Sequence, residues 1–138
     1  MSDHHSSISS EIAEEQASAW LQEYGAAWEH GDADRIVELF AANGSYRVTP
    51  FDSPLVGHDA IRQYWLENPA THVNVEFSFE IVTLVETQCF CTWASKFIKG
   101  DRQLELRGLF RLIFQQHRTK GLLCETLQEW WHERSSAV

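Results

Sequence analysis

Acidic and aromatic residues alternate along one predicted strand near the end of the chain, and they carry the clearest signal for chemistry. This segment, residues 120–133, reads KGLLCETLQEWWHE. Because side chains alternate between the two faces of a strand, one face is predicted to carry Glu125, Leu127, Glu129 and Trp131. A carboxylate among apolar neighbours is costly to bury unless it is used or satisfied. We therefore predict a pocket beside this strand.

Glu129 is the candidate general acid or base. Tryptophans lie next to it in the sequence, and the loss of water around its carboxylate would raise its pKa towards neutrality. A group with such a pKa is suited to proton transfer. The alternative is structural, with the carboxylate held inside the sheet by Arg47, Arg107 or a tryptophan N–H. The other face of the strand carries Trp130. Because each face then carries a tryptophan, we predict that other parts of the protein cover both faces of this strand.

Composition restricts the class of partner. The 138 residues hold 11 Lys and Arg against 20 Asp and Glu, a formal net charge of −9, and no basic stripe is present, so nucleic acid is not an expected partner. No apolar run approaches the ~18 residues of a membrane span. The N-terminus also lacks a signal-peptide pattern. We expect a cytoplasmic protein that has no membrane partner.

Residues 1–10 are polar and serine-rich, which predicts a disordered tail before a single domain over residues 11–138. An odd number of cysteines, three, predicts reduced thiols rather than a disulfide framework. The histidines, among them His58, His72, His117 and His132, lack ligand spacing, so no metal site is predicted. No nucleotide-binding motif is present, and we expect no cofactor.

Hydrophobic periodicity predicts three helices. Apolar residues recur at helical spacing over residues 12–28 and again over residues 36–40. Gly31 is predicted to end the first helix, and Asp32 or Asp34 to cap the second,. An Asn-Gly pair at residues 43–44 is predicted to break the chain before an extended run, residues 45–49. Gly57 and Asp59 begin a third helix that Pro69 ends,.

Four long strands follow, at residues 73–85, 87–99, 104–114 and 120–133. Short turns between long strands require antiparallel hairpins. The order of elements is typical of an α+β fold. Long strands twist and curl, so helices on the concave face would leave an interior between the two layers.

Three stretches resemble the SnoaL-like (polyketide cyclase-like) branch of the nuclear transport factor 2-like superfamily. They are YGAAWEHGDAD from residue 24, TPFDSPLVGHDAIRQYW over residues 49–65, and EWWH over residues 129–132. The resemblance spans about residues 17–132. It implies a cone-shaped fold in which three N-terminal helices pack on a curved antiparallel sheet. Members of this superfamily include isomerases, dehydratases, cyclases and proteins without catalysis, so the fold alone does not select a reaction.

Resemblance to the ketosteroid-isomerase branch implies a role for Tyr24 in holding an oxyanion. The general-base aspartate of that branch falls on Val48 or Thr49, and the acid that binds the oxyanion falls on Gly108. Two of its three catalytic residues are therefore not present here. Resemblance to the epoxide-hydrolase-like branch places the last-strand carboxylate on Glu129. The Arg and Asp partners of that carboxylate would fall near Trp93 and Ser95, so this triad is incomplete too.

The resemblance also implies which strand residues face the pocket: Cys89, Cys91, Trp93, Ser95, Phe97, Leu106, Gly108, Phe110 and Leu112. From these observations we expect catalytic roles for Glu129 and Tyr24. The residues expected to contact the substrate are Trp93, Trp131, Ser95, Thr49 and Phe110.

The leading hypothesis is a cofactor-independent isomerase, dehydratase or cyclase that acts by proton transfer on a small apolar molecule. The alternative is a non-catalytic small-molecule-binding or scaffold protein of the same fold. We also expect a homodimer through the outer face of the sheet, where residues 90, 92, 94 and 98 would form an exposed apolar patch.

Overall fold

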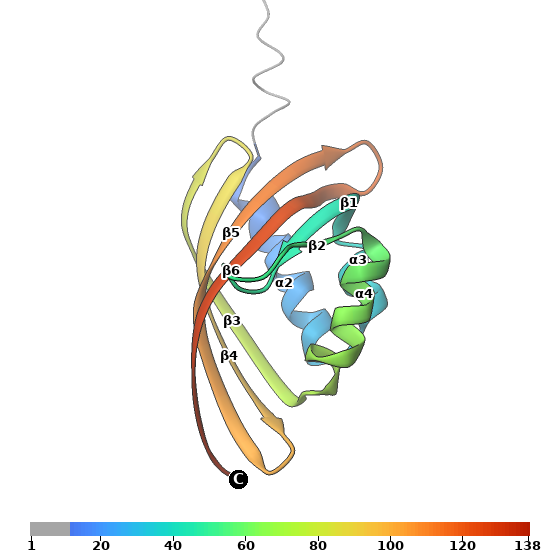
Figure 1. The fold of residues 1–138 in the computed structure, drawn as a ribbon. Coiled ribbons are helices and arrows are strands. Elements are labelled where there is room, and N and C mark those ends of the chain that lie inside the picture. The colour runs from blue at the N-terminus through green and yellow to red at the C-terminus, as the bar shows by residue number, and fades with distance from the viewer. Residues whose placement is uncertain (1–11) are drawn as a thin grey trace, which may run out of the picture.

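The computed structural model describes residues 12–138, and the predicted polar tail lies outside the described residues. Within this range, helices lie in the hollow of one curved sheet of six strands (Figure 1). The fold is α+β, as predicted. No helix of residues 12–138 is both long and apolar enough to cross a membrane.

Two of the helices come before the first strand and one comes after it. Helix α2 spans Glu14–Glu29 and buries the apolar stripe that contains Tyr24 and Trp28. Gly31 follows with a φ of 63°, a left-handed conformation that ends the helix,. The Asp32 side chain then accepts a hydrogen bond from the N–H of Arg35 at 3.1 Å and caps α3, Ala33–Val37, as predicted.

Helix α3 is shorter than predicted because the chain is already extended at Phe40. Strand β1 spans Phe40–Arg47, so the prediction that residues 43–44 break the chain before a strand was wrong. Gly44 lies inside β1, where the register shifts between Phe40 and Ser45. A Cβ at Gly44 would lie 2.9 Å from the carbonyl oxygen of Cys124. The glycine is therefore needed for close approach of two strands.

The remaining elements are β2 (Leu55–Val56), α4 (His58–Glu67), the 3-10 helix η1 (Pro69–Thr71), β3 (Val73–Val85), β4 (Gln88–Lys99), β5 (Arg102–His117) and β6 (Gly121–Ala137). The strand order is β2-β1-β6-β5-β4-β3. Strands β3 to β6 form the predicted antiparallel hairpins. Strand β1, in contrast, runs parallel to β6, a pairing that periodicity does not reveal.

Burial along β4 alternates with a period of two, so the predicted inner face is confirmed. The inner residues of β4 are Cys89, Cys91, Trp93, Ser95 and Phe97, and all are buried. The cysteines of the chain are buried and free, as predicted.

One bulge corrects the predicted faces of the last strand. Phe114 pairs with Cys124 while Ile113 pairs with Thr126, which leaves Glu125 without a partner residue,. Glu125 is therefore exposed, although it was predicted to share a face with Glu129. Trp130 is 39% exposed on the opposite face, so the prediction that both faces are covered does not hold at this residue within residues 12–138.

Candidate functional site

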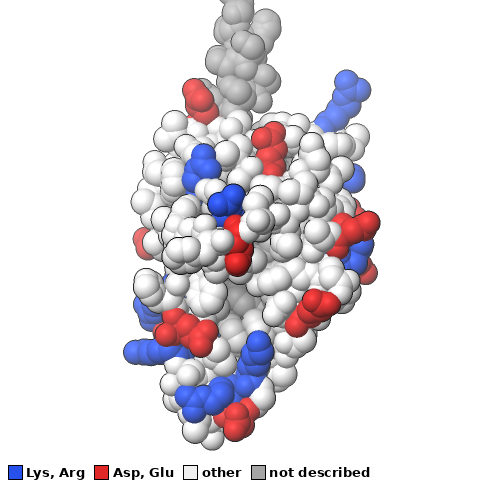
Figure 2. Space-filling view, in the orientation of Figure 1, with Lys and Arg blue, Asp and Glu red and all other residues white. Residues whose placement is uncertain are grey.

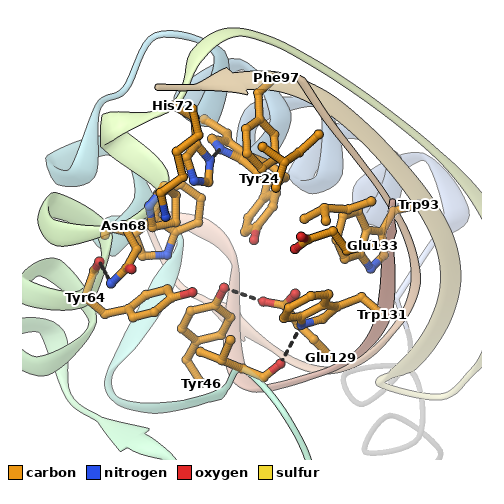
Figure 3. Close-up of a pocket in the computed structure, with 17 residues that line it drawn as sticks. Tyr24, Tyr46, Tyr64, Asn68, His72, Trp93, Phe97, Glu129, Trp131 and Glu133 are labelled. Carbon is orange, nitrogen blue, oxygen red and sulfur yellow. Dashed lines mark hydrogen bonds between the residues drawn. The ribbon is translucent and has the colours of Figure 1, made fainter. Parts of the chain in front are cut away.

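A cavity of about 250 Å³ lies between the inner face of the sheet and the helices. Figure 2 shows this side of the molecule hollowed between the helices and the lower part of the sheet. Of the 17 described residues that line the cavity, eight are Tyr, Trp or Phe (Figure 3). These eight are Tyr24, Trp28, Tyr46, Tyr64, Trp65, Trp93, Phe97 and Trp131.

Glu129 of β6 lies in the wall of this cavity and is only 6% exposed. Its inward direction follows from register, because its strand neighbour Leu127 and its cross-strand partner Phe110 are both fully buried. Burial raises the pKa of Glu129 to about 8, and a hydrogen bond from Tyr46 partly opposes this shift,. The carboxyl group can therefore change its protonation state near neutral pH.

The partner of Glu129 is Tyr46, whose hydroxyl donates to Oε2 of Glu129 (Figure 3). Tyr46 reaches this position because the parallel pairing of β1 with β6 puts it beside Leu127. Within residues 12–138, neither an arginine nor a tryptophan N–H, the structural alternatives that the sequence suggested, contacts Glu129 in place of Tyr46. Arg107 instead forms an ion pair with Glu105.

Tyr24 of α2 and Tyr64 of α4 also line the cavity. Burial, and then the charge of Glu129, raises the pKa of each tyrosine hydroxyl above its ordinary value. Tyr24 is held by edge contacts with Trp65 and Phe110, at centroid distances of 5.6 and 5.4 Å. Its hydroxyl therefore stays protonated near neutral pH and can donate a hydrogen bond.

Trp93 and Trp131 line the cavity, as predicted. The ring of Trp93 stacks on Phe110 with centroids 5.1 Å apart. Trp131 donates its indole N–H to the carbonyl oxygen of Val48 at 3.0 Å, which ties β6 to the end of β1. Both rings are thus fixed before any ligand binds, and they form rigid apolar walls.

Ser95, Thr49 and Phe110 do not line the cavity. Ser95 faces inward but is 1% exposed and covered by its neighbours. Phe110 is fully buried behind Trp93. Thr49 donates to Oδ2 of Asp52 at 3.1 Å, so its hydroxyl serves the turn after β1. Strand alternation predicts which face a residue occupies, but it does not predict the depth of that residue below the cavity surface.

Gly108 stands where the ketosteroid-isomerase branch has the acid that binds the oxyanion, and the structure has no room for a side chain at this position. A Cβ there would lie 2.3 Å from the carbonyl oxygen of Trp130 and 2.9 Å from Cε2 of Trp93. We expect Gly108→Ala to lower the free energy of unfolding by about 1–3 kcal/mol, measured by urea denaturation. An unchanged free energy of unfolding would show that the strands can relax around the methyl group.

The other end of the cavity was missed by sequence analysis. His72 stacks on Phe97 there, and Asn68, Lys99 and Glu133 are further polar residues in the cavity lining. These residues come from the end of α4, from the start of β3 and from the ends of β4 and β6, and no sequence pattern links them. Among residues 12–138, no three His, Cys, Asp or Glu side chains gather in an arrangement that could hold a metal ion.

Several solved structures have the same fold. The Δ5-3-ketosteroid isomerase from Mycobacterium sp. matches with a TM-score of 0.70 and 13% identity, covering 88% of this chain and 98% of that chain. A putative scytalone dehydratase from Novosphingobium aromaticivorans matches with a TM-score of 0.69 and 10% identity, covering 90% and 86%. The epoxide hydrolase/cyclase-like enzyme SalBIII, associated with pyran ring formation in salinomycin, matches with a TM-score of 0.68 and 16% identity, covering 88% and 95%.

These identities are low, so the structural matches show the fold alone. A comparison with curated protein sequences finds no match. The sequence profile of the SnoaL-like domain matches residues 21–120, which is most of the chain. Together with the structural matches, this profile confirms the resemblance to the SnoaL-like branch of the nuclear transport factor 2-like superfamily. The chain belongs to the SnoaL-like domain family.

Proposed function

We propose that this protein is a cofactor-independent enzyme that transfers protons on a small, ring-bearing carbonyl compound. The supporting observation is the buried carboxyl group of Glu129, which accepts a hydrogen bond from Tyr46 at an aromatic cavity wall and whose pKa is raised to about 8. A general base works best when its pKa lies near the working pH. Isomerisation, dehydration and cyclisation all begin with such a proton transfer.

In the proposed reaction, the ionised Glu129 removes a proton from the carbon next to the substrate carbonyl. The C–H bond breaks, its electron pair forms an enolate, and the proton moves to the carboxylate. The hydroxyl of Tyr24 donates a hydrogen bond to the enolate oxygen, which is where negative charge develops. Glu129 then returns the proton to another carbon in an isomerisation, or to a leaving hydroxyl in a dehydration.

The size of the cavity limits the size of the substrate. At the packing density of protein interiors, about 0.74, a cavity of about 250 Å³ accommodates a ligand with a van der Waals volume of roughly 185 Å³. This volume suits a molecule of two fused rings better than a four-ring steroid. Trp93 and Trp131 would contact the faces of such a ring system,.

A direct test uses 1-tetralone, a two-ring ketone with exchangeable protons next to its carbonyl. We expect the protein to accelerate the replacement of these protons by deuterium in D₂O, followed by proton NMR. Acceleration would establish the proton transfer without knowledge of the natural substrate. Binding of 1-tetralone without acceleration would instead favour the non-catalytic alternative, a small-molecule-binding or scaffold protein.

We also propose that the protein forms a homodimer through the outer face of the sheet. A row of side chains crosses this face, with Thr92 opposite Leu109 and Leu109 opposite Trp130. Trp130 is 39% exposed, and a large exposed aromatic residue on a sheet face suits burial against a second copy.

The dimer prediction is tested by light scattering during serial dilution. We expect Trp130→Lys to produce a monomer at concentrations where the unmodified protein is a dimer. Phe51→Ser is the control, because Phe51 is 97% exposed and lies in the loop after β1. A monomeric unmodified protein at every concentration would exclude this interface.

A further inference from the structure

We propose that His72 is a neutral hydrogen-bond donor that selects ligands with a second acceptor oxygen, at the opposite end from the carbonyl bound near Glu129. This inference rests on the proposed function of the same cavity and adds the class of its ligand. The substrate would then be a two-ring compound that carries oxygen at both ends.

The hydrogen bond from Trp28 determines the tautomer of His72. The indole Nε1–H of Trp28 donates to Nδ1 of His72 at 3.3 Å. Nδ1 can accept this bond only when it carries no proton, so the neutral ring must carry its proton on Nε2. No hydrogen bond joins Nε2 to another group within residues 12–138. The Nε2–H is therefore an available donor.

The ring of His72 is also fixed in orientation. It stacks on Phe97 with centroids 3.7 Å apart and an angle of 4° between the planes. The backbone N–H of His72 donates to the carbonyl oxygen of Pro69 at 3.1 Å, which holds the residue at the corner between η1 and β3. A donor whose ring and backbone are both held loses little entropy when it binds a ligand.

The surroundings of His72 favour the neutral form. Burial, and then the positive charge of Lys99, lowers the pKa of His72 to about 4. Glu133 also lines the cavity, but its carboxylate lies near Tyr24 in Figure 3. Because the ring is uncharged at neutral pH, it suits a neutral acceptor such as a carbonyl or ether oxygen better than a carboxylate.

Figure 3 shows His72 across the cavity from Glu129, with Tyr24 and the carboxylate of Glu133 between them in this view. Tyr24 is a donor near Glu129, and His72 is a donor at the far end. Two donors on opposite sides of a cavity lined largely by aromatic residues match a ring system with an acceptor oxygen on each side. A ligand with oxygen at one end only would leave the His72 N–H without a partner, which costs binding free energy.

The test compares two probes of similar shape, 6-acetyl-1-tetralone and 6-isopropyl-1-tetralone, by isothermal titration calorimetry. Only the acetyl compound has a second acceptor oxygen. We expect the ratio of its affinity to that of the isopropyl compound to fall by about five- to tenfold in His72→Phe, which corresponds to one hydrogen bond. His72→Phe keeps an aromatic ring against Phe97 but removes the donor.

Two further variants separate a hydrogen bond from a general structural effect. His72→Gln supplies an amide N–H and should restore most of the affinity ratio. His132→Phe makes the same substitution on an exposed residue and should leave the ratio unchanged. In addition, ¹⁵N NMR of the unmodified protein should show the Nε2–H tautomer for His72, and Trp28→Phe should abolish this preference.

The outcomes also separate this inference from the proposed function. An unchanged ratio in His72→Phe, with both probes still bound, would overturn the role of His72 and leave the proposed function standing. Failure of the unmodified protein to bind either probe would overturn both. Observation of the Nδ1–H tautomer would contradict the assignment of the donor and overturn the inference on its own.

Discussion

Glu129→Gln is expected to slow deuterium exchange of 1-tetralone by about 10²–10⁴-fold, the usual contribution of a general base. The glutamine side chain has nearly the same shape and can still accept the hydrogen bond from Tyr46,. It cannot take up a proton from carbon. Glu125→Gln is the matched control, because Glu125 is on the same strand but exposed, and its exchange rate should not change.

The dependence of this rate on pH identifies the active form of Glu129. With a pKa of about 8, only a minority of the protein carries the ionised base at neutral pH. The exchange rate should therefore rise about tenfold per pH unit below the pKa and level off above it. A rate that falls with rising pH through this range would mean that the protonated carboxyl group is the active form, as a general acid.

Stability should change with pH in the opposite sense. The pKa of Glu129 is about 8 in the folded protein, against an ordinary value of 4.5. Its contribution to stability is therefore fully present below about pH 4.5 and is lost as the pH rises to about 8. Over this range the folded state keeps its carboxyl group protonated while the unfolded state ionises, which lowers the free energy of unfolding by about 1.4 kcal/mol per pH unit.

Glu129→Gln should remove this loss, because its side chain does not ionise. We expect the variant to match the unmodified protein at acidic pH and to exceed its free energy of unfolding by on the order of 5 kcal/mol above pH 8. Urea denaturation at a series of pH values measures the difference, and Glu125→Gln should show none. If the curves for Glu129→Gln and the unmodified protein stay parallel, Glu129 ionises normally in the folded state. Loss of activity together with a gain in stability is the pattern expected of a functional residue.

Much of the fold follows from local patterns. Apolar residues at helical spacing predict α2, and alternation along β4 predicts that Trp93 faces the interior. Alternation also predicts that Glu129 faces the interior, because Leu127, two residues earlier on the same face, is apolar. These predictions succeed because each depends on residues close together in the chain.

The parts that sequence analysis missed depend on distant contacts. Tyr46 and Glu129 are 83 residues apart, and only the parallel pairing of β1 with β6 brings them together. The bulge that turns Glu125 outward is a single extra residue, for which the sequence has no marker. His72 enters the cavity from the corner between η1 and β3, where no periodic pattern applies.

Membership of the SnoaL-like domain family therefore explains the fold better than the chemistry. The solved structures that share this fold include a ketosteroid isomerase and a putative dehydratase, and the shared architecture does not select one reaction. The reaction must therefore be argued from the groups that line the cavity of this chain, among them Glu129, Tyr46, Tyr24, Tyr64 and His72. The proposed proton transfer depends on the first of these groups.

Glu129 can be examined directly by NMR of protein labelled with ¹³C at the glutamate side-chain carboxyl groups. The resonance that disappears in Glu129→Gln belongs to Glu129, and its chemical shift is followed as the pH is raised. The account predicts a midpoint near pH 8. A midpoint near 4.5, the ordinary value for glutamate, would contradict it, because burial would then not hold the carboxyl group in its neutral form near neutral pH.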